Sequence, residues 1–191
     1  YVDPKIGTGG HGHVFVGANV PFGFVQLGPT SIPQAWDWCS GYHESDSTVI
    51  GFSHTHLSGT GIGDLFDVTV MPVVGDVTCA RGTADDPTSG LWSYADRTRE
   101  VARPGYYSVP LTRYGVTAEL TATKRVGLHR YTFPENADGH VVLDLAHGIY
   151  NYDGKVLWST LRVESDTLIT GYRITNGWAR TNYTYFAISF S

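Results

Sequence analysis

The sequence is poor in cysteine, in basic clusters and in long apolar runs, and each shortage excludes a class of protein. Two cysteines, Cys39 and Cys79, are too few for a disulfide framework, and no Cys/His spacing matches a structural zinc site. The 13 lysines and arginines never cluster and the formal net charge is -5, so a nucleic-acid partner is not indicated. No apolar run approaches the roughly 20 residues that a transmembrane helix needs, so no membrane span is predicted.

Amphipathic helices are also missing from the pattern, and this absence favours an all-β fold. No long segment repeats its apolar residues with the 3.6-residue helical period, while aromatics at 13% and 23 glycines favour strands with many turns. The alternation is clearest over 116–123, where every second residue is apolar. Strands are predicted at 22–27, 48–53, 67–74, 106–111, 116–123, 126–133, 140–145, 157–163, 167–174 and 183–191.

Close strand spacing with short turns predicts a large antiparallel β-sandwich that occupies residues 1–191 as one domain. Pro72 is expected at a sheet edge or a bulge, since proline cannot donate to a ladder. Residues 76–103 are polar and irregular, and we expect a surface excursion that carries Trp92 and Tyr94. The apolar segment 183–191 ends without a turn, and we expect the polypeptide to continue beyond it.

Four glycines surround His11 and His13 near the start of the chain, at positions 7, 9, 10 and 12. They do not resemble a phosphate-binding loop, because no strand-turn-helix pattern and no Gly-Lys-Ser/Thr ending accompany them. The glycines are expected to let the backbone turn tightly. The two histidines then either face a neighbouring surface or simply close the turn.

The segment 35–56 concentrates aromatic and ionisable side chains between turn-forming residues, so it is predicted to be a functional loop. Trp36, Asp37, Trp38 and His43 are the first candidates for sugar contact, since an indole face packs on a sugar ring while carboxylates and imidazoles bind its hydroxyls. At least one of the tryptophans is alternatively a core anchor. Cys39 is interpreted as a small residue beside this pocket.

The charged neighbours of the tryptophans receive different predictions. His54 and His56 would point to one side of an extended segment, where they form a polar wall with Asp64 or bind a metal. Glu44 and Asp46 are expected to be solvated turn residues.

Several long motifs, in one order, resemble the N-terminal domain of glycoside hydrolase family 92. The resemblance covers almost the whole chain. It rests on the motifs at 6–13 (IGTGGHGH), 21–27 (PFGFVQL), 36–43 (WDWCSGYH), 51–61 (GFSHTHLSGTG), 104–107 (PGYY), 119–123 (ELTAT), 129–131 (HRY) and 171–173 (GYR). Val16, where proline is usual, and Phe66, where glycine is usual, depart from the pattern.

The resemblance implies an inverting, calcium-dependent exo-α-mannosidase that acts on mannose-containing oligosaccharides and is secreted or periplasmic in bacteria. It also implies a galactose mutarotase-like sandwich followed by a C-terminal (α/α)6 barrel. In the family, the general acid, the general base and most calcium ligands belong to the barrel, so no catalytic and no metal-binding residue is assigned in this sequence. The substrate-binding candidates are Trp36, Asp37, Trp38, His43, His11, His13, His54 and His56.

Two other function classes stay open at the level of the sequence. An aldose epimerase needs a histidine acid and a glutamate base that face one sugar, and His129 with Glu119 or His43 with Glu44 could supply them. A stand-alone carbohydrate-binding module would need only the aromatic loop.

Overall fold

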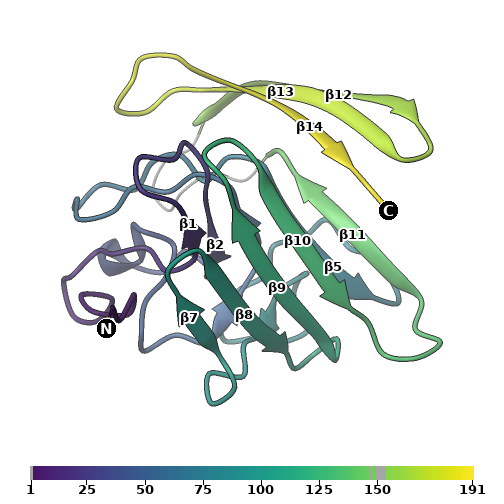
Figure 1. Ribbon diagram of the computed structural model, residues 1–191, viewed down its shortest axis with the longest axis horizontal. Coiled ribbons are helices and arrows are strands. Elements are labelled where there is room, and N and C mark those ends of the chain that lie inside the picture. Colours follow the sequence, from purple (N-terminus) through teal and green to yellow (C-terminus); the bar gives the residue numbers. More distant parts are fainter. Residues whose placement is uncertain (1, 147, 149–153) are drawn as a thin grey trace.

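The computed structural model describes residues 2–146, 148 and 154–191, and its strands form two packed sheets with a third sheet beside them (Figure 1). The first sheet has the order β1-β2-β4-β5-β11 and is antiparallel throughout. Its strands are β1 (Ala18–Asn19), β2 (Gln26–Thr30), β4 (Gly51–Ser53), β5 (Thr69–Val74) and β11 (Gly139–Asp144).

The second sheet packs over the first and has the order β10-β9-β8-β7. It consists of β7 (Val101–Arg103), β8 (Tyr106–Leu111), β9 (Val116–Ala122) and β10 (Gly127–Thr132). A short pair, β3 (Thr48–Val49) with β6 (Ser93–Tyr94), lies beside these sheets. A 3-10 turn at Trp36–Trp38 (η1) is the one helical element of the described residues.

A third antiparallel sheet, β12 (Val156–Ser165), β13 (Leu168–Thr175) and β14 (Asn182–Ser189), crosses the end of the sandwich at the top of Figure 1. Buried ion pairs connect it to the segment that precedes β5. The Lys155 ammonium pairs with Asp64, and the Arg173 guanidinium lies 3.4 Å from an Asp67 carboxylate oxygen. Burial lowers the pKa of Lys155, while the hydrogen bond from Lys155 helps to hold the pKa of Asp64 below its ordinary value despite burial.

One continuous apolar core fills the space between the two packed sheets. Strand β9 contributes to this core from the second sheet. Its apolar residues are buried while the intervening residues are not, as the alternation in its sequence predicts. Large side chains join the core from both sheets: Tyr107 and Leu111 come from β8, and Leu27, Phe52 and Met71 come from the facing sheet. Burying such side chains is the main source of the stability that fixes the loops at the sandwich edge.

Most predicted strands are confirmed, with boundaries that move by one or two residues, and the all-β sandwich is confirmed with them. Two predictions need correction. The strand expected at 22–27 starts only at Gln26, since Gly23 and Phe24 form a turn against Lys124. The strand expected at 48–53 is split at Ile50, and its halves β3 and β4 pair with different partners.

The polar excursion at 76–103 is only partly a surface loop. Residues 76–89 are mostly exposed, but Trp92 is 1% exposed and belongs to a small second core with Ile32 and Ile50. The sequence predicts Pro72 at a sheet edge or a bulge, but β5 lies between β4 and β11, and Pro72 pairs regularly with Val141 of β11. Proline is tolerated there because the register with β4 consists of the single pair Phe52 with Val70, which Pro72 lies beyond.

Candidate functional site

The glycine-rich turn near the N-terminus positions His11 and His13 in the way the sequence predicts. A Cβ on Gly12 would lie 1.8 Å from the Gly7 carbonyl oxygen, so only glycine allows these two segments to approach. His13 itself has φ 53°, in the left-handed region that residues other than glycine rarely adopt. Its carbonyl oxygen accepts hydrogen bonds from Ser40 Oγ at 2.6 Å and from Gly59 N at 2.7 Å, which hold it there.

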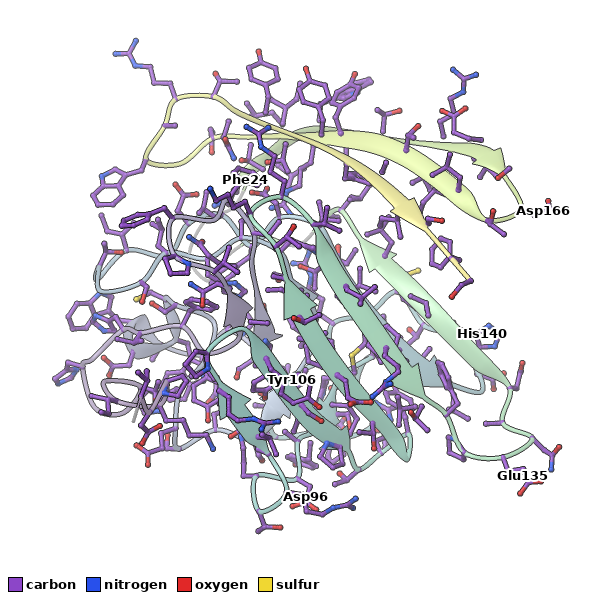
Figure 2. The ribbon with its side chains drawn as sticks, in the orientation of Figure 1. Phe24, Asp96, Tyr106, Glu135, His140 and Asp166 are labelled. Carbon is purple, nitrogen blue, oxygen red and sulfur yellow. The ribbon has the colours of Figure 1, made fainter. Side chains whose placement is uncertain are left out.

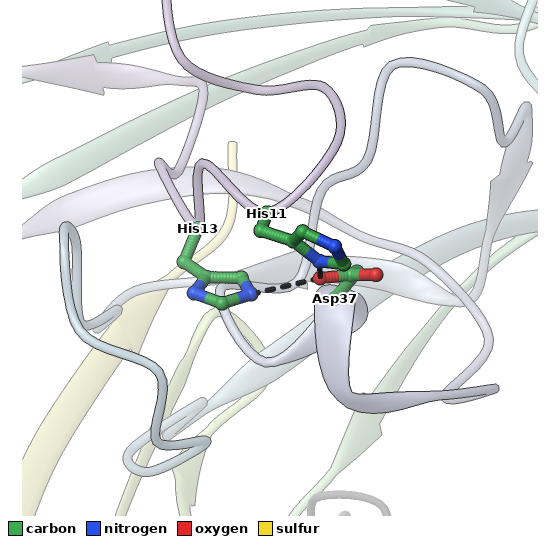
Figure 3. A group of neighbouring side chains, drawn as sticks. All are labelled: His11, His13 and Asp37. Atoms are coloured by element: carbon green, nitrogen blue, oxygen red, sulfur yellow. Dashed lines mark hydrogen bonds and ion pairs between the residues drawn. The ribbon is translucent and has the colours of Figure 1, made fainter.

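Both histidines converge on the carboxylate of Asp37 in the 3-10 turn η1 (Figure 3). His11 Nδ1 lies 2.7 Å and His13 Nε2 lies 3.0 Å from the same oxygen, Asp37 Oδ1. The hydrogen bond from His11, followed by that from His13, lowers the pKa of Asp37. The turn and the tryptophan segment therefore form one cluster, which we call the His-Asp cluster (His11, His13 and Asp37).

Trp36 flanks this cluster and is 50% exposed. Its ring meets the imidazole of His13 in a T-shaped arrangement, with the centroids 4.3 Å apart and the planes at 69°. Its indole N–H donates to the Gly61 carbonyl oxygen at 2.6 Å. The indole is thus fixed in orientation while half of its surface remains accessible, which is the arrangement that an aromatic platform for a ligand needs.

Trp38 is the more anchored of the two tryptophans. Its N–H donates to Asp46 Oδ2 at 2.7 Å, and its ring stacks on His43 with a centroid distance of 4.5 Å. His43 contacts Ser45 Oγ at 2.7 Å and the Gly10 carbonyl oxygen at 3.1 Å, so it links the tryptophan segment to the glycine turn.

Asp46 is not the solvated turn residue that the sequence analysis expected, whereas Glu44 is exposed. Its carboxylate is buried and accepts hydrogen bonds from Trp38, from Gln34 Nε2 at 2.8 Å and from both the backbone and the hydroxyl of Thr48. The spacing Asp-Ser-Thr, in which an aspartate can bond the backbone two residues later, is the signal that could have indicated this role.

A second buried carboxylate, that of Glu100, stabilises the same loop through hydrogen bonds and ion pairs. Glu100 accepts hydrogen bonds from Tyr42 and Tyr107 and pairs with Lys5 and Arg97, while Arg97 also donates to the Asp46 carbonyl oxygen at 2.5 Å. Burial alone would raise the pKa of Glu100, but the two cations and the tyrosine outweigh it and lower the pKa. Nothing in the local sequence around Glu100 indicates these long-range partners.

His54 and His56 lie outside the His-Asp cluster. His54 Nδ1 contacts the Val68 carbonyl oxygen at 2.6 Å, and its Nε2 lies 3.0 Å from His129 Nε2. His56 is 2% exposed, and its Nδ1 contacts the Gln26 carbonyl oxygen at 2.7 Å. Asp64 hydrogen-bonds to Lys155 and to the backbone of Leu65 and Trp178, so the predicted polar wall is replaced by separate buried contacts in the described residues.

The geometry disfavours the two epimerase pairs. In the β9–β10 ladder, Arg130 stands opposite Glu119 and binds its carboxylate, whereas His129 stands opposite buried Leu120. Successive residues of a strand point to opposite faces, so Glu119 and His129 cannot address one sugar. His43 uses both ring nitrogens within the protein.

The described residues contain one group whose side chains could hold a metal ion together, and it is the His-Asp cluster. Two of its three ligand atoms are imidazole nitrogens, whereas calcium takes six to eight oxygen ligands. The cluster therefore does not fit calcium. Cys39 is buried with its thiol directed at the Thr60 carbonyl oxygen, and both cysteines are free, so neither belongs to this cluster.

Comparison with known proteins identifies the family. The Glycosyl hydrolase family 92 N-terminal domain matches residues 1–191. The chain belongs to this family. The resemblance carried by the sequence motifs is thereby confirmed, and the sandwich described above is a family 92 N-terminal domain.

Solved structures of the family share the fold over the whole chain. A family GH92 alpha-mannosidase from Bacteroides thetaiotaomicron, in complex with mannoimidazole, is 40% identical with a TM-score of 0.94, covering 100% of this chain and 25% of that one. An inverting mannosidase from the VPI-5482 strain of the same species is 27% identical with a TM-score of 0.75. The match covers 100% of this chain and 24% of the mannosidase.

A curated relative, an uncharacterized secreted glycosidase from Arthroderma benhamiae, is 32% identical over 140 residues, which cover 71% of this chain and 17% of that protein. The family 92 domain described here thus spans about a quarter or less of the length of its relatives. In the part of the chain that is described, no helix has the length and apolar character that crossing a bilayer requires.

Proposed function

We propose that the intact protein is a secreted or periplasmic, inverting, calcium-dependent exo-α-mannosidase that acts on mannose-containing glycans. Family membership supports a glycosidase, and the similarity to mannosidase structures supports mannose as the sugar. The similarity to a secreted glycosidase supports export. An epimerase and a stand-alone binding module are not favoured, because the matched relatives are glycosidases and mannosidases.

Within that enzyme, the family 92 N-terminal domain contributes a wall of the sugar pocket. The observation that carries this assignment is the half-exposed Trp36, whose indole is fixed by Gly61 and His13 directly beside the His-Asp cluster. An aromatic face packs on the C–H face of a pyranose, and adjacent imidazole and carboxylate groups hydrogen-bond its hydroxyls.

The acid and base of the reaction are expected in a C-terminal (α/α)6 barrel of the same polypeptide. Inversion requires a general acid on the leaving oxygen and a carboxylate base that activates water on the opposite face of the sugar. The calcium ligands are expected in the same barrel, since the His-Asp cluster offers mainly nitrogen. The residues of this domain bind and orient the sugar.

Hydrolysis of a synthetic α-mannoside tests this proposal. The intact protein is expected to release mannose with inversion, as followed by NMR of the first-formed anomer, and to lose activity on chelation until calcium is returned. The isolated domain, residues 1–191, is expected to release none. Activity of the isolated domain would overturn the assignment of acid and base to the barrel, and an intact protein that cleaves no mannoside would overturn the proposed substrate.

A further inference from the structure

The His-Asp cluster brings three potential metal-ligating atoms close together. His11 Nδ1, His13 Nε2 and Asp37 Oδ1 all lie within 4.8 Å of one another. The two nitrogens are 2.7 Å and 3.0 Å from the carboxylate oxygen. Ligand bonds of about 2.0–2.2 Å to zinc place neighbouring ligand atoms roughly 3.0–3.5 Å apart, so both nitrogen–oxygen distances need to lengthen by only a few tenths of an ångström to reach that range.

The backbone that carries these side chains is fixed by several hydrogen bonds, so the positions of the ligand atoms are constrained by the fold. His13 is in the left-handed region, its carbonyl oxygen has two donors, and its side chain is 6% exposed against the ring of Trp36. Backbone strain that persists because the surroundings fix it is typical of functional positions. Asp37 is carried by η1, whose ends are fixed by the hydrogen bonds of Trp36 and Trp38.

The remaining side of the cluster is open to ligands from solvent. The His11 side chain is 78% exposed and that of Asp37 is 23% exposed. Two imidazoles and one carboxylate with an open position form the ligand set of zinc and similar first-row transition metals, and not of calcium or magnesium.

We propose that His11, His13 and Asp37 form a binding site for a zinc-type divalent cation, separate from the calcium expected in the barrel. Each imidazole binds the ion through the nitrogen that now faces Asp37, and one carboxylate oxygen completes the protein ligands. Solvent water fills the open position. This inference does not rest on the sugar contact, because the ion binds whether or not a sugar is present.

Isothermal titration of the intact protein with Zn²⁺, without sugar and with calcium in excess, tests the proposal. A Cys79→Ser background removes the exposed thiol. In this background, zinc binding by the parent protein is compared with that of His11→Ala, which removes an exposed ligand, and with that of His140→Ala. Nε2 of His140, on β11, lies 3.3 Å from Oδ1 of Asp138, just before that strand. This exposed His-Asp pair lies at the opposite side of the molecule from the N-terminal turn (Figure 2), so it is a matched control.

The expected result is one zinc site that weakens about tenfold or more with His11→Ala, about 1.4 kcal/mol, and that His140→Ala leaves unchanged. Cobalt substitution should add a visible absorption band that His11→Ala abolishes. Asp37→Asn, an isosteric change, should weaken zinc as well. Equal zinc binding by the background protein and His11→Ala, or no binding at all, would overturn the proposal. Neither outcome depends on mannosidase activity.

Discussion

Replacing Trp36 by alanine in the intact protein removes the platform on which the proposed sugar contact depends. A tryptophan side chain buries up to about 250 Å² on full coverage, and 50% of Trp36 is exposed, so a bound sugar covers at most about 125 Å². At about 25 cal/mol per Å² this is at most roughly 3 kcal/mol, and partial coverage gives about 1–3 kcal/mol. The corresponding fall in kcat/KM is about 5- to 150-fold.

Trp38→Ala is the matched control, since this ring is more enclosed and donates to buried Asp46. Its removal leaves a cavity and takes one of several donors from the buried Asp46 carboxylate, which costs about 2–4 kcal/mol and lowers the Tm by roughly 5–15 °C. Trp36→Ala loses ring contacts with His11 and His13 and a hydrogen bond to Gly61, but its side chain is half-exposed, so its Tm falls by a few degrees at most.

Steady-state kinetics on an α-mannoside and thermal unfolding of both variants separate the two roles. The reasoning is refuted if Trp36→Ala keeps kcat/KM within about twofold of the parent while folded. It is also refuted if Trp36→Ala, and not Trp38→Ala, causes the larger loss of stability.

Three further changes test the surroundings of the site. Gly12→Ala should destabilise the protein by about 1–3 kcal/mol and reduce activity, because its Cβ would meet the Gly7 carbonyl. Gly9→Ala is the control, since its Cβ would meet only the movable Glu44 side chain, and equal denaturation midpoints for the two variants would contradict this reasoning. Asp37→Asn should lower kcat/KM about tenfold with little change in Tm, and unchanged kinetics would remove Asp37 from the sugar contact. Burial lowers the pKa of His129 to about 3 and of His56 to about 4, so the unfolded chain binds more protons below about pH 6.5. Stability should be complete above that pH and fall as the pH falls towards 4, and a flat profile from urea unfolding at each pH would contradict the buried neutral imidazoles.

The sequence predicts the regular parts of this fold well, because alternation along a strand such as 116–122 directly records which face is buried. It fails where a strand changes partner, since the break at Ile50 depends on β6, which lies far along the chain. Buried ion pairs such as Lys155 with Asp64 are equally hidden, because each charged residue resembles a solvated one until its distant partner is known.

The site shows the same division between local and distant information. The glycine turn and the aromatic loop are local patterns. The loop is predicted to carry function from its residues, whereas the histidines of the turn could equally serve only to close it. Their meeting at Asp37 joins positions 24 and 26 residues apart in the chain, which no local pattern specifies. The burial of Asp46 was missed partly for the same reason, since two of its donors, Gln34 and Trp38, lie 12 and 8 residues away, while only the bonds to Thr48 are local.

A crystal structure of the intact protein with a bound mannose-configured inhibitor would show whether Trp36 and the His-Asp cluster line the sugar pocket. We expect the sugar ring to contact the indole of Trp36 within about 4 Å and to hydrogen-bond to at least one member of the His-Asp cluster. An inhibitor bound in the active centre without any contact to Trp36, His11, His13 or Asp37 would contradict this expectation.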